Sequence, residues 1–190
     1  GIVTEEEGGS ATLSTNFDVS VTGVADSPTV SVSDVSGAED SAIALPIVVG
    51  LNDTDGSEQL SVNLTGIPEG AILSDGENTF QASADSNNVD ITNWNISGLN
   101  ITPPLNSTEQ FAINISTTAT ENDGDSISVN ESFSISIDPV ADEPILSVSD
   151  VVGVEDSAIA LDIATSLTDT SETLSIQIAG VPEGASLSSG

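Results

Sequence analysis

A segment of 20 residues occurs twice in this chain of 190 residues, and the distance between the two copies strongly constrains the fold. DSPTVSVSDVSGAEDSAIAL, residues 26–45, returns as DEPILSVSDVVGVEDSAIAL, residues 142–161, an offset of 116 residues. Over residues 26–54, 19 of 29 positions are identical at this offset. A fixed period of this kind indicates tandem units of one fold.

The two ends of the chain match parts of the same unit. TEEEGGSATL from Thr4 aligns with TENDGDSISV from Thr120, again at an offset of 116. After a deletion of Asp55 and Gly56 in the last copy, IPEGAILSDG from Ile67 aligns with VPEGASLSSG from Val181. The sequence therefore predicts three units: the C-terminal part of a repeat in residues 1–25, a complete repeat in residues 26–141, and the N-terminal part of the next in residues 142–190.

Alternation of apolar and polar residues predicts short strands throughout the complete repeat. The predicted strands are Val30–Val35, Ile43–Val49, Leu60–Leu64, Thr79–Ala82, Val89–Ile91, Leu99–Ile101, Phe111–Thr117 and Ile127–Ile137. Turn sequences such as DTDGSE and ENDGD separate them, and no segment has a helical period. We therefore expect an all-β chain of tandem antiparallel β-sandwich repeats, immunoglobulin-like or cadherin-like, with Trp94 in or beside the core.

The chain has 31 acidic residues and no Lys, Arg or His. Nucleic acids and anionic membranes are excluded as partners, because both are bound mainly through Lys and Arg. Without His, Cys, Lys or Tyr, the chain also lacks a nucleophile or base that is active near neutral pH. Nothing marks the carboxylate pair of a glycoside hydrolase. We therefore expect no enzyme, and the longest apolar stretch, Ala42–Gly50, is too short for membrane insertion.

The acidic residues predict calcium sites, because the complete repeat carries 18 of them with no basic residue to balance their charge. Calcium takes six to eight oxygen ligands. We expect an ion between each Pro-flanked linker and the acidic pair that follows it in the next repeat, with a further cluster in the ENDGD turn. The candidate ligands are Asp26, Glu39, Asp40, Glu121, Asp123, Asp125, Asp138, Asp142, Glu155 and Asp156.

Two other interpretations of these acidic residues were weighed. An EF-hand beginning at Asp53 is excluded, because its sixth residue would be Glu58 instead of Gly and its twelfth is Leu64. Aspartates in isolated DG turns cap the turn and solvate the surface. The recurring carboxylates at the linkers fit neither interpretation.

The sequence resembles the tandem cadherin-like repeats of giant bacterial RTX adhesins. The resemblance covers the whole chain and rests on DTDGSEQLSVNLTGIPEGAILSDG, on WNISGLNITPP, and on the TENDGD turn that precedes the linker. It implies a module exported by type I secretion, held on the outer surface of a Gram-negative cell, and folded and stiffened there by calcium. In that setting the chain would be an extender that projects a distal adhesive region for attachment or biofilm formation.

An alternative is a repeat that itself binds a glycan or a protein on another surface. Such a module would need a position at which one repeat departs from the next, and the overlapping segments differ by the deletion of Asp55–Gly56 and by scattered substitutions. The expected partners are the neighbouring repeats of the same chain. A contact between an unpaired strand edge and another copy of the chain is a further expectation.

Overall fold

The computed structural model describes residues 1–188. Within this part of the chain there are fifteen strands and one short 3₁₀ helix, η1 (Ile96–Gly98), and there is no α-helix. The predicted all-β fold is confirmed. Ser189 and Gly190, which end the expected third unit, lie outside the described residues.

The larger sheet has five strands in the order β10-β7-β12-β13-β4. Neighbouring strands are antiparallel except β13 and β4, which run parallel. Its two longest strands form one hairpin with ten paired positions. The strands are β10 (Asn88–Asp90), β7 (Glu58–Thr65), β12 (Phe111–Glu121), β13 (Ser126–Asp138) and β4 (Val35–Ala38).

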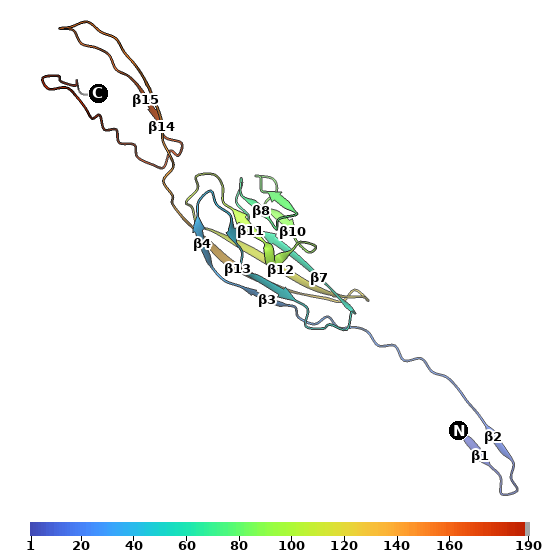
Figure 1. The fold of residues 1–190 in the computed structure, drawn as a ribbon. Coiled ribbons are helices and arrows are strands. Elements are labelled where there is room, and N and C mark those ends of the chain that lie inside the picture. The colour runs from blue at the N-terminus through green and yellow to red at the C-terminus, as the bar shows by residue number, and fades with distance from the viewer. Residues whose placement is uncertain (189–190) are drawn as a thin grey trace.

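A four-stranded antiparallel sheet faces the larger one, in the order β5-β11-β8-β9 (Figure 1). A separate pair, β3 with β6, completes this layer. The strands are β5 (Ile43–Ala44), β11 (Asn100–Thr102), β8 (Ile72–Ser74), β9 (Thr79–Gln81), β3 (Thr29–Val32) and β6 (Ile47–Gly50). Together the two layers form a β-sandwich.

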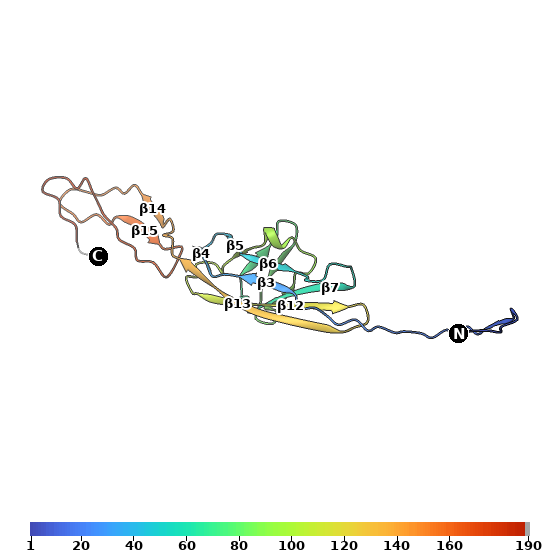
Figure 2. The ribbon, with the colours of Figure 1, turned by 90° about the horizontal axis from the view of Figure 1, so that it is seen from below.

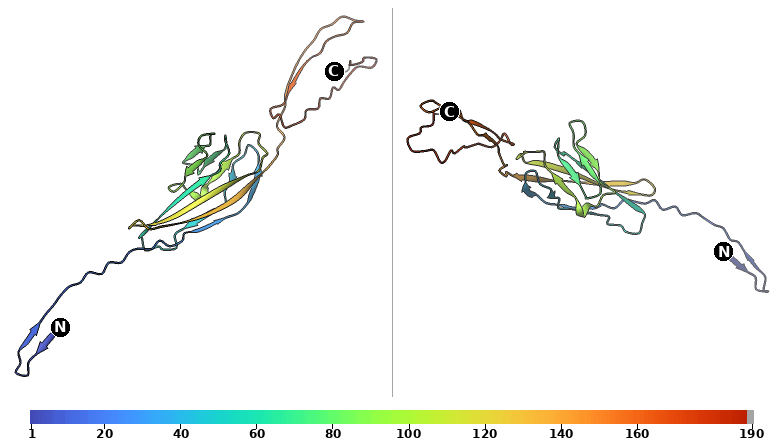
Figure 3. Two further views of the ribbon diagram at one scale, coloured as in Figure 1. Left: turned by 180° about the vertical axis from the view of Figure 1, so that it is seen from behind. Right: turned by 45° about the horizontal axis from the view of Figure 1, so that its top comes forward.

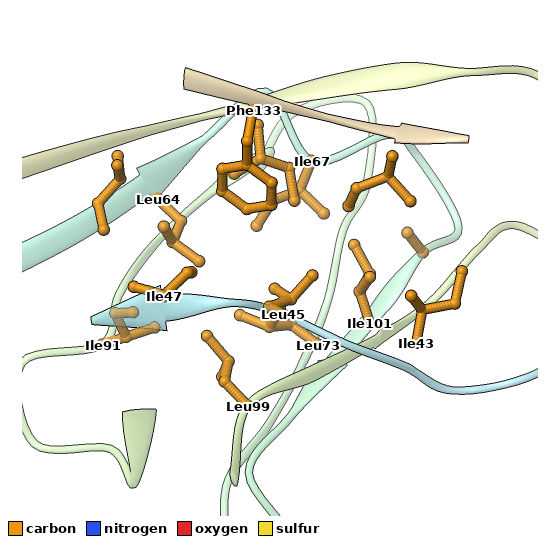
Figure 4. Close-up of a cluster of buried hydrophobic side chains, with 14 of the residues drawn as sticks. Ile43, Leu45, Ile47, Leu64, Ile67, Leu73, Ile91, Leu99, Ile101 and Phe133 are labelled. Carbon is orange, nitrogen blue, oxygen red and sulfur yellow. The ribbon is translucent and has the colours of Figure 1, made fainter. Parts of the chain in front are cut away.

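The hydrophobic core lies between the layers. Along β12 and the second half of β13 every second side chain points inward, so that Ile113, Ile115, Phe133 and Ile135 are buried while the residues between them are polar. These side chains meet those of the other layer, including Leu73 (Figure 4). The partly buried Trp94 packs against this cluster, as predicted.

Two predicted strands are each divided into two shorter strands. The segment Val30–Val35 contributes to β3 in one layer and β4 in the other, and Ile43–Val49 is broken at Pro46 into β5 and β6. Alternation reports only which side chains face the core, so it does not reveal where the backbone changes its partner strand. The three-residue strand β8 was not predicted, because it is too short to alternate clearly.

Both ends of the chain repeat parts of this sandwich (Figure 3). The hairpin of β1 (Ile2–Thr4) and β2 (Ser10–Thr12) matches the tip of the β12–β13 hairpin at the offset of 116. Near the C-terminus, β14 (Ile145–Ser149) and β15 (Asp162–Ser166) pair in the register of β3 and β6: Ile145 opposes Ser166 as Thr29 opposes Gly50. The repeat found in the sequence is thus also a repeat of strand pairing.

The chain enters the sandwich at one end and leaves it at the other (Figure 2). We call the end at the β12–β13 turn, which residues 23–26 contact, the proximal end. The end where β4 and β13 finish is the distal end. The 13 residues of β13 connect the two ends, a length of about 43 Å at roughly 3.3 Å per residue.

Candidate metal centre at the repeat junctions

At the proximal end, the turn between β12 and β13 holds the incoming linker. Glu121 N donates to Asp125 O at 2.8 Å, and Gly124 takes a left-handed φ of 100° that closes the turn. The turn directs two carboxylates at the linker backbone: Asp123 Oδ2 accepts from Gly23 N at 2.7 Å, and Asp125 Oδ2 accepts from Ala25 N at 2.9 Å.

Glu58 lies beside this turn, because the first residue of β7 is paired with Glu121 at the end of β12. The Glu58 side chain is only 7% exposed. Its Oε1 accepts a hydrogen bond from Asp26 N in the linker, whereas its Oε2 is buried without a partner among the described residues. A buried carboxylate oxygen without a hydrogen bond or a counter-charge is costly.

The charge of Glu58 affects its neighbour Glu121. Burial raises the pKa of Glu121, a hydrogen bond from Ser57 Oγ opposes this rise, and the negative charges of Glu58 and Asp123 add to it. The proximal end therefore concentrates negative charge that the chain itself does not neutralise.

The distal end carries a second buried glutamate. Because β4 runs parallel to β13, Glu39 follows β4 at the point where β13 ends at Asp138. Glu39 N donates to Asp138 O at 3.0 Å, and Glu39 Oε1 accepts from Val140 N at 2.7 Å. The side chain is 5% exposed, and its Oε2 has no partner in the described part of the chain.

Beyond the distal linker, the next repeat repeats the proximal arrangement. Asp142 N donates to Glu172 Oε1 at 2.6 Å, as Asp26 N donates to Glu58. Burial raises the pKa of Asp142, and the negative charges of Glu172, Asp40 and Asp169 raise it further. Carboxylates from two consecutive repeats therefore influence one another across this linker.

Asp169 shows how the two repeats cover the junction. Its carboxylate accepts from Ser171 N and Ser171 Oγ, both at 2.7 Å, and these bonds lower its pKa. Asp169 is 2% exposed, whereas the matching Asp53, at the proximal end, is only half-buried. Conversely, Glu58 is buried beneath its own β12–β13 turn, whereas the matching Glu172 is half-buried, and residues 142–190 contain no counterpart of that turn. The two junctions therefore bury different members of the matching carboxylates, Asp169 at the distal one and Glu58 at the proximal one.

Most of the predicted ligands lie at one junction or the other. The proximal end brings together four of them, and the distal junction brings together four others. The proximal group is Asp26, Glu121, Asp123 and Asp125, and the distal group is Glu39, Asp40, Asp138 and Asp142. Glu155 and Asp156 are exposed in the C-terminal part, where Asp156 keeps the left-handed φ of its counterpart Asp40.

We predicted that the acidic pair Glu39–Asp40 lies beside the linker that precedes it in the sequence. For Glu39 this prediction was wrong. Glu39 contacts the linker that follows its own repeat, about 100 residues later, while Asp26 pairs with Glu58 at the opposite end. The physical reason is that β4 crosses to the larger sheet and runs parallel to β13, which carries Glu39 to the distal end.

Four carboxylates of the junctions were not predicted from the sequence: Asp53, Glu58, Asp169 and Glu172. A signal for them exists, because Asp53 and Glu58 in DTDGSE recur as Asp169 and Glu172 in DTSE. The deletion of Asp55–Gly56 between them changes the offset from 116 to 114, so the second glutamate falls out of the simple alignment.

Between residues 1 and 188, no three acidic side chains already form a group that could hold a metal ion. Several of them instead accept hydrogen bonds from backbone amides: Glu39, Glu58, Asp123, Asp125 and Glu172. The described residues also include no helix long and apolar enough to cross a membrane.

The chain matches no protein-family model. No curated protein matches it.

Proposed function

We propose that this chain is a structural extender segment of a bacterial cell-surface adhesin, stiffened by calcium ions bound at the junctions between repeats. The observation that carries the proposal is the pair of buried glutamates, one at each end of the sandwich, that hold the linkers and retain unpartnered carboxylate oxygens.

The course of the chain supports an extending role. Because the linkers leave opposite ends of the sandwich, successive repeats add length along one direction (Figure 1). Each repeat would contribute about 43 Å if the next follows in line with β13. Flexible linkers would let the repeats bend relative to one another and would shorten the array, because small interdomain interfaces permit relative motion.

The chemistry of the junction fits calcium. All its ligand atoms are oxygens, which suit hard divalent cations, and calcium accepts irregular sets of six to eight such ligands. The free Oε2 atoms of Glu39 and Glu58 are acceptors that no group of the described chain satisfies. Since the carboxylates are not already gathered, binding includes their reorientation. The residues that would hold ions are Glu39, Asp40, Asp138 and Asp142 with Asp169 and Glu172 at the distal junction, and Asp26, Asp53, Glu58, Glu121, Asp123 and Asp125 at the proximal one.

Bound calcium would join the repeats because its ligands come from both sides of the linker. It would also compete with protons: the raised pKa values of Asp142 and Glu121 mean that these groups take up protons at higher pH than ordinary carboxylates. Calcium affinity should therefore fall in mild acid.

The setting follows from the resemblance to RTX adhesin repeats. A chain without Lys or Arg suits an extracellular environment that supplies calcium and salt. We propose a location on the bacterial surface, export by type I secretion, and a role in projecting a distal adhesive region for attachment or biofilm formation. No catalytic activity is proposed.

Thermal unfolding of the full chain in EDTA and in millimolar calcium tests the metal site. The informative variant combines Glu39→Gln and Glu58→Gln, because each amide oxygen can still accept the linker hydrogen bond while one charge is lost at each end. A matched control combines Glu69→Gln and Glu77→Gln, which remove two exposed charges.

We expect calcium to raise the melting temperature of the wild type and of the control equally, since a ligand stabilises the state that binds it. The Glu39→Gln/Glu58→Gln variant should lose most of this rise while melting no lower than the wild type in EDTA. An absent calcium effect on the wild type, or a full effect on that variant, would refute the site.

A further inference from the structure

We propose that Asn106 ties each repeat directly to the next, through a neutral hydrogen bond that holds the junction when no cation is bound. The proposal deepens the extender function and rests on it for its biological meaning. Its basis is a direct contact between two consecutive repeats that involves no carboxylate. Asn106 Nδ2 donates to Thr168 O at 3.2 Å.

Asn106 lies on the loop between β11 and β12, at the distal end of the complete repeat. The loop is anchored by the buried Pro103 and closed by a hydrogen bond from Ser107 N to Pro104 O at 3.1 Å. Asn106 has a φ of 55°, in the left-handed region that Asn tolerates better than most residues. The loop therefore presents its side-chain amide from a defined backbone position.

The backbone of Asn106 is joined to the acidic junction. Its N–H donates to Asp40 Oδ1 at 2.9 Å, and Asp40 is one of the groups whose charge raises the pKa of Asp142. One residue thus positions a carboxylate of its own repeat with its main chain and holds the next repeat with its side chain.

The acceptor, Thr168, belongs to a loop that is fixed to its own linker. Thr168 Oγ1 donates to Glu143 O at 3.4 Å, and at the matching positions of the complete repeat Asn52 Nδ2 donates to Ser27 O at 2.7 Å. Holding Thr168 therefore restrains the linker as well as the loop. The following residue, Asp169, is 2% exposed, whereas the matching Asp53 of the complete repeat is half-buried.

An amide-to-carbonyl bond does not depend on calcium or on the ionisation of either partner. With calcium bound, this hydrogen bond would add to the link that the ion makes between the repeats. Without calcium, the hydrogen bond would still restrain bending at the junction. Asn106 is in this sense a positioning residue for the metal site and a direct contact between repeats.

Pulsed electron paramagnetic resonance between two spin labels measures this restraint. The chain has no cysteine, so Thr79→Cys on β9 and Ser147→Cys on β14 give one label on each side of the junction without background. The distance distribution is recorded in EDTA and in calcium for the labelled parent and for three further variants.

Two variants remove the amide donor in different ways. Asn106→Gly keeps the left-handed backbone accessible, and Asn106→Asp keeps the size and shape of the side chain. Asn88→Asp on β10, which is exposed and remote from the junction, controls for the added charge.

In EDTA we expect both Asn106 variants to broaden the distance distribution at least twofold relative to the parent, while Asn88→Asp leaves it unchanged. A distribution in EDTA that is the same for the parent and both Asn106 variants would overturn the proposal. Failure of the extender function has a different signature: calcium would not narrow the distribution of the parent, whatever the Asn106 variants do in EDTA.

Discussion

Buried polar atoms without partners occur at two kinds of position in the described chain. The Oε2 atoms of Glu39 and Glu58 lie at the ends of the sandwich beside the linkers. Thr117 Oγ1 lies on the core face of β12, fully buried among apolar side chains. The unpartnered glutamate oxygens at the ends of the sandwich suggest a ligand. The unpartnered Thr117 hydroxyl in the core lowers the stability of the fold and has no proposed function.

Replacing Thr117 with Val should therefore stabilise the fold. The substitution keeps the branched shape and removes a hydroxyl that is buried without a partner, which costs about 1–2 kcal/mol. Urea unfolding in EDTA measures the gain. Thr118→Val is the control, because Thr118 Oγ1 forms an exposed hydrogen bond with Ser128 Oγ at 2.7 Å and should show no gain. A Thr117→Val variant less stable than the wild type would contradict this reading of the core.

Asp75 is the opposite case, a carboxylate whose oxygens are well satisfied. Oδ1 accepts from Glu77 N at 2.9 Å and Asn78 N at 2.6 Å, and Oδ2 accepts from Asn95 N at 2.7 Å and Asn78 Nδ2 at 3.0 Å. These bonds, those from Asn78 above all, hold the pKa of Asp75 far below its ordinary value. The carboxylate joins the β8–β9 turn to the residue that precedes η1.

Asp75→Asn should lower the unfolding midpoint at neutral pH, because an amide has one acceptor oxygen and would turn its own N–H groups toward donors. Since the folded pKa is depressed, the contribution of Asp75 is present above the unfolded pKa of about 3.9 and is lost as pH falls through the folded value. The difference in unfolding midpoint between wild type and variant should be constant from about pH 5 to 8 and should become smaller below about pH 4. Chemical denaturation across this range measures it, with the exposed Asp85→Asn as control. A gap that stays undiminished at about pH 3, or none at neutral pH, would count against this role.

At the scale of single residues, the sequence predicted most of the junction carboxylates that recur at one constant offset, but not Asp53 and Asp169. Asp26 and Asp142 were found because their linkers are nearly identical. Glu58 and Glu172 were not, because a loop deletion separates their alignment from that of the linkers. The spatial partner of Glu39 was also beyond prediction, since it depends on a parallel strand pairing across about 100 residues.

At the scale of the elements, the transfer of the chain from β3 to β4 determines where Glu39 lies. Asp34 stands at this change of sheet, and its Oδ1 accepts from Ser134 N at 2.7 Å, one residue before the parallel pairing of β13 with β4 begins. Close packing also defines β4: an added Cβ at Gly37 would meet Ile43 Cγ1 at 2.5 Å. The same crowding occurs between Gly153 and Ile159 in the next repeat.

Gly37→Ala should therefore destabilise the sandwich by about 1–3 kcal/mol, the usual range for overpacking a filled core position. It should also weaken the calcium response, because Glu39 follows β4 directly. Urea unfolding and calcium titration measure the two effects. Gly9→Ala is the control, since its nearest contact would be Glu5 Cβ at 3.9 Å. A neutral Gly37→Ala would mean that β4 has freedom to shift and does not fix Glu39.

The long antiparallel strands β7, β12 and β13 were predictable because apolar and polar residues alternate along them, with a buried face along β7, β12 and the second half of β13. The short strands of the opposite layer were less predictable from the sequence. Their order and their change of partners depend on contacts between residues far apart in the chain, which local alternation does not contain.

At the scale of the whole molecule, an acidic composition goes together with an extended course of the chain (Figure 2). A chain with 31 acidic residues and no basic ones places buried carboxylates at both ends of a sandwich through which it passes lengthwise. The repeat period predicted tandem units. The direction in which they add length follows only from the structure, because it depends on the linkers meeting opposite ends of β13.

Small-angle X-ray scattering of the full chain, in EDTA and in millimolar calcium, tests the central claim most directly. We predict that calcium increases the maximum dimension and replaces the profile of a bending ensemble with that of one extended conformer, while magnesium at equal ionic strength does so much less. A profile that is the same in EDTA and in calcium would contradict the account of a calcium-stiffened extender.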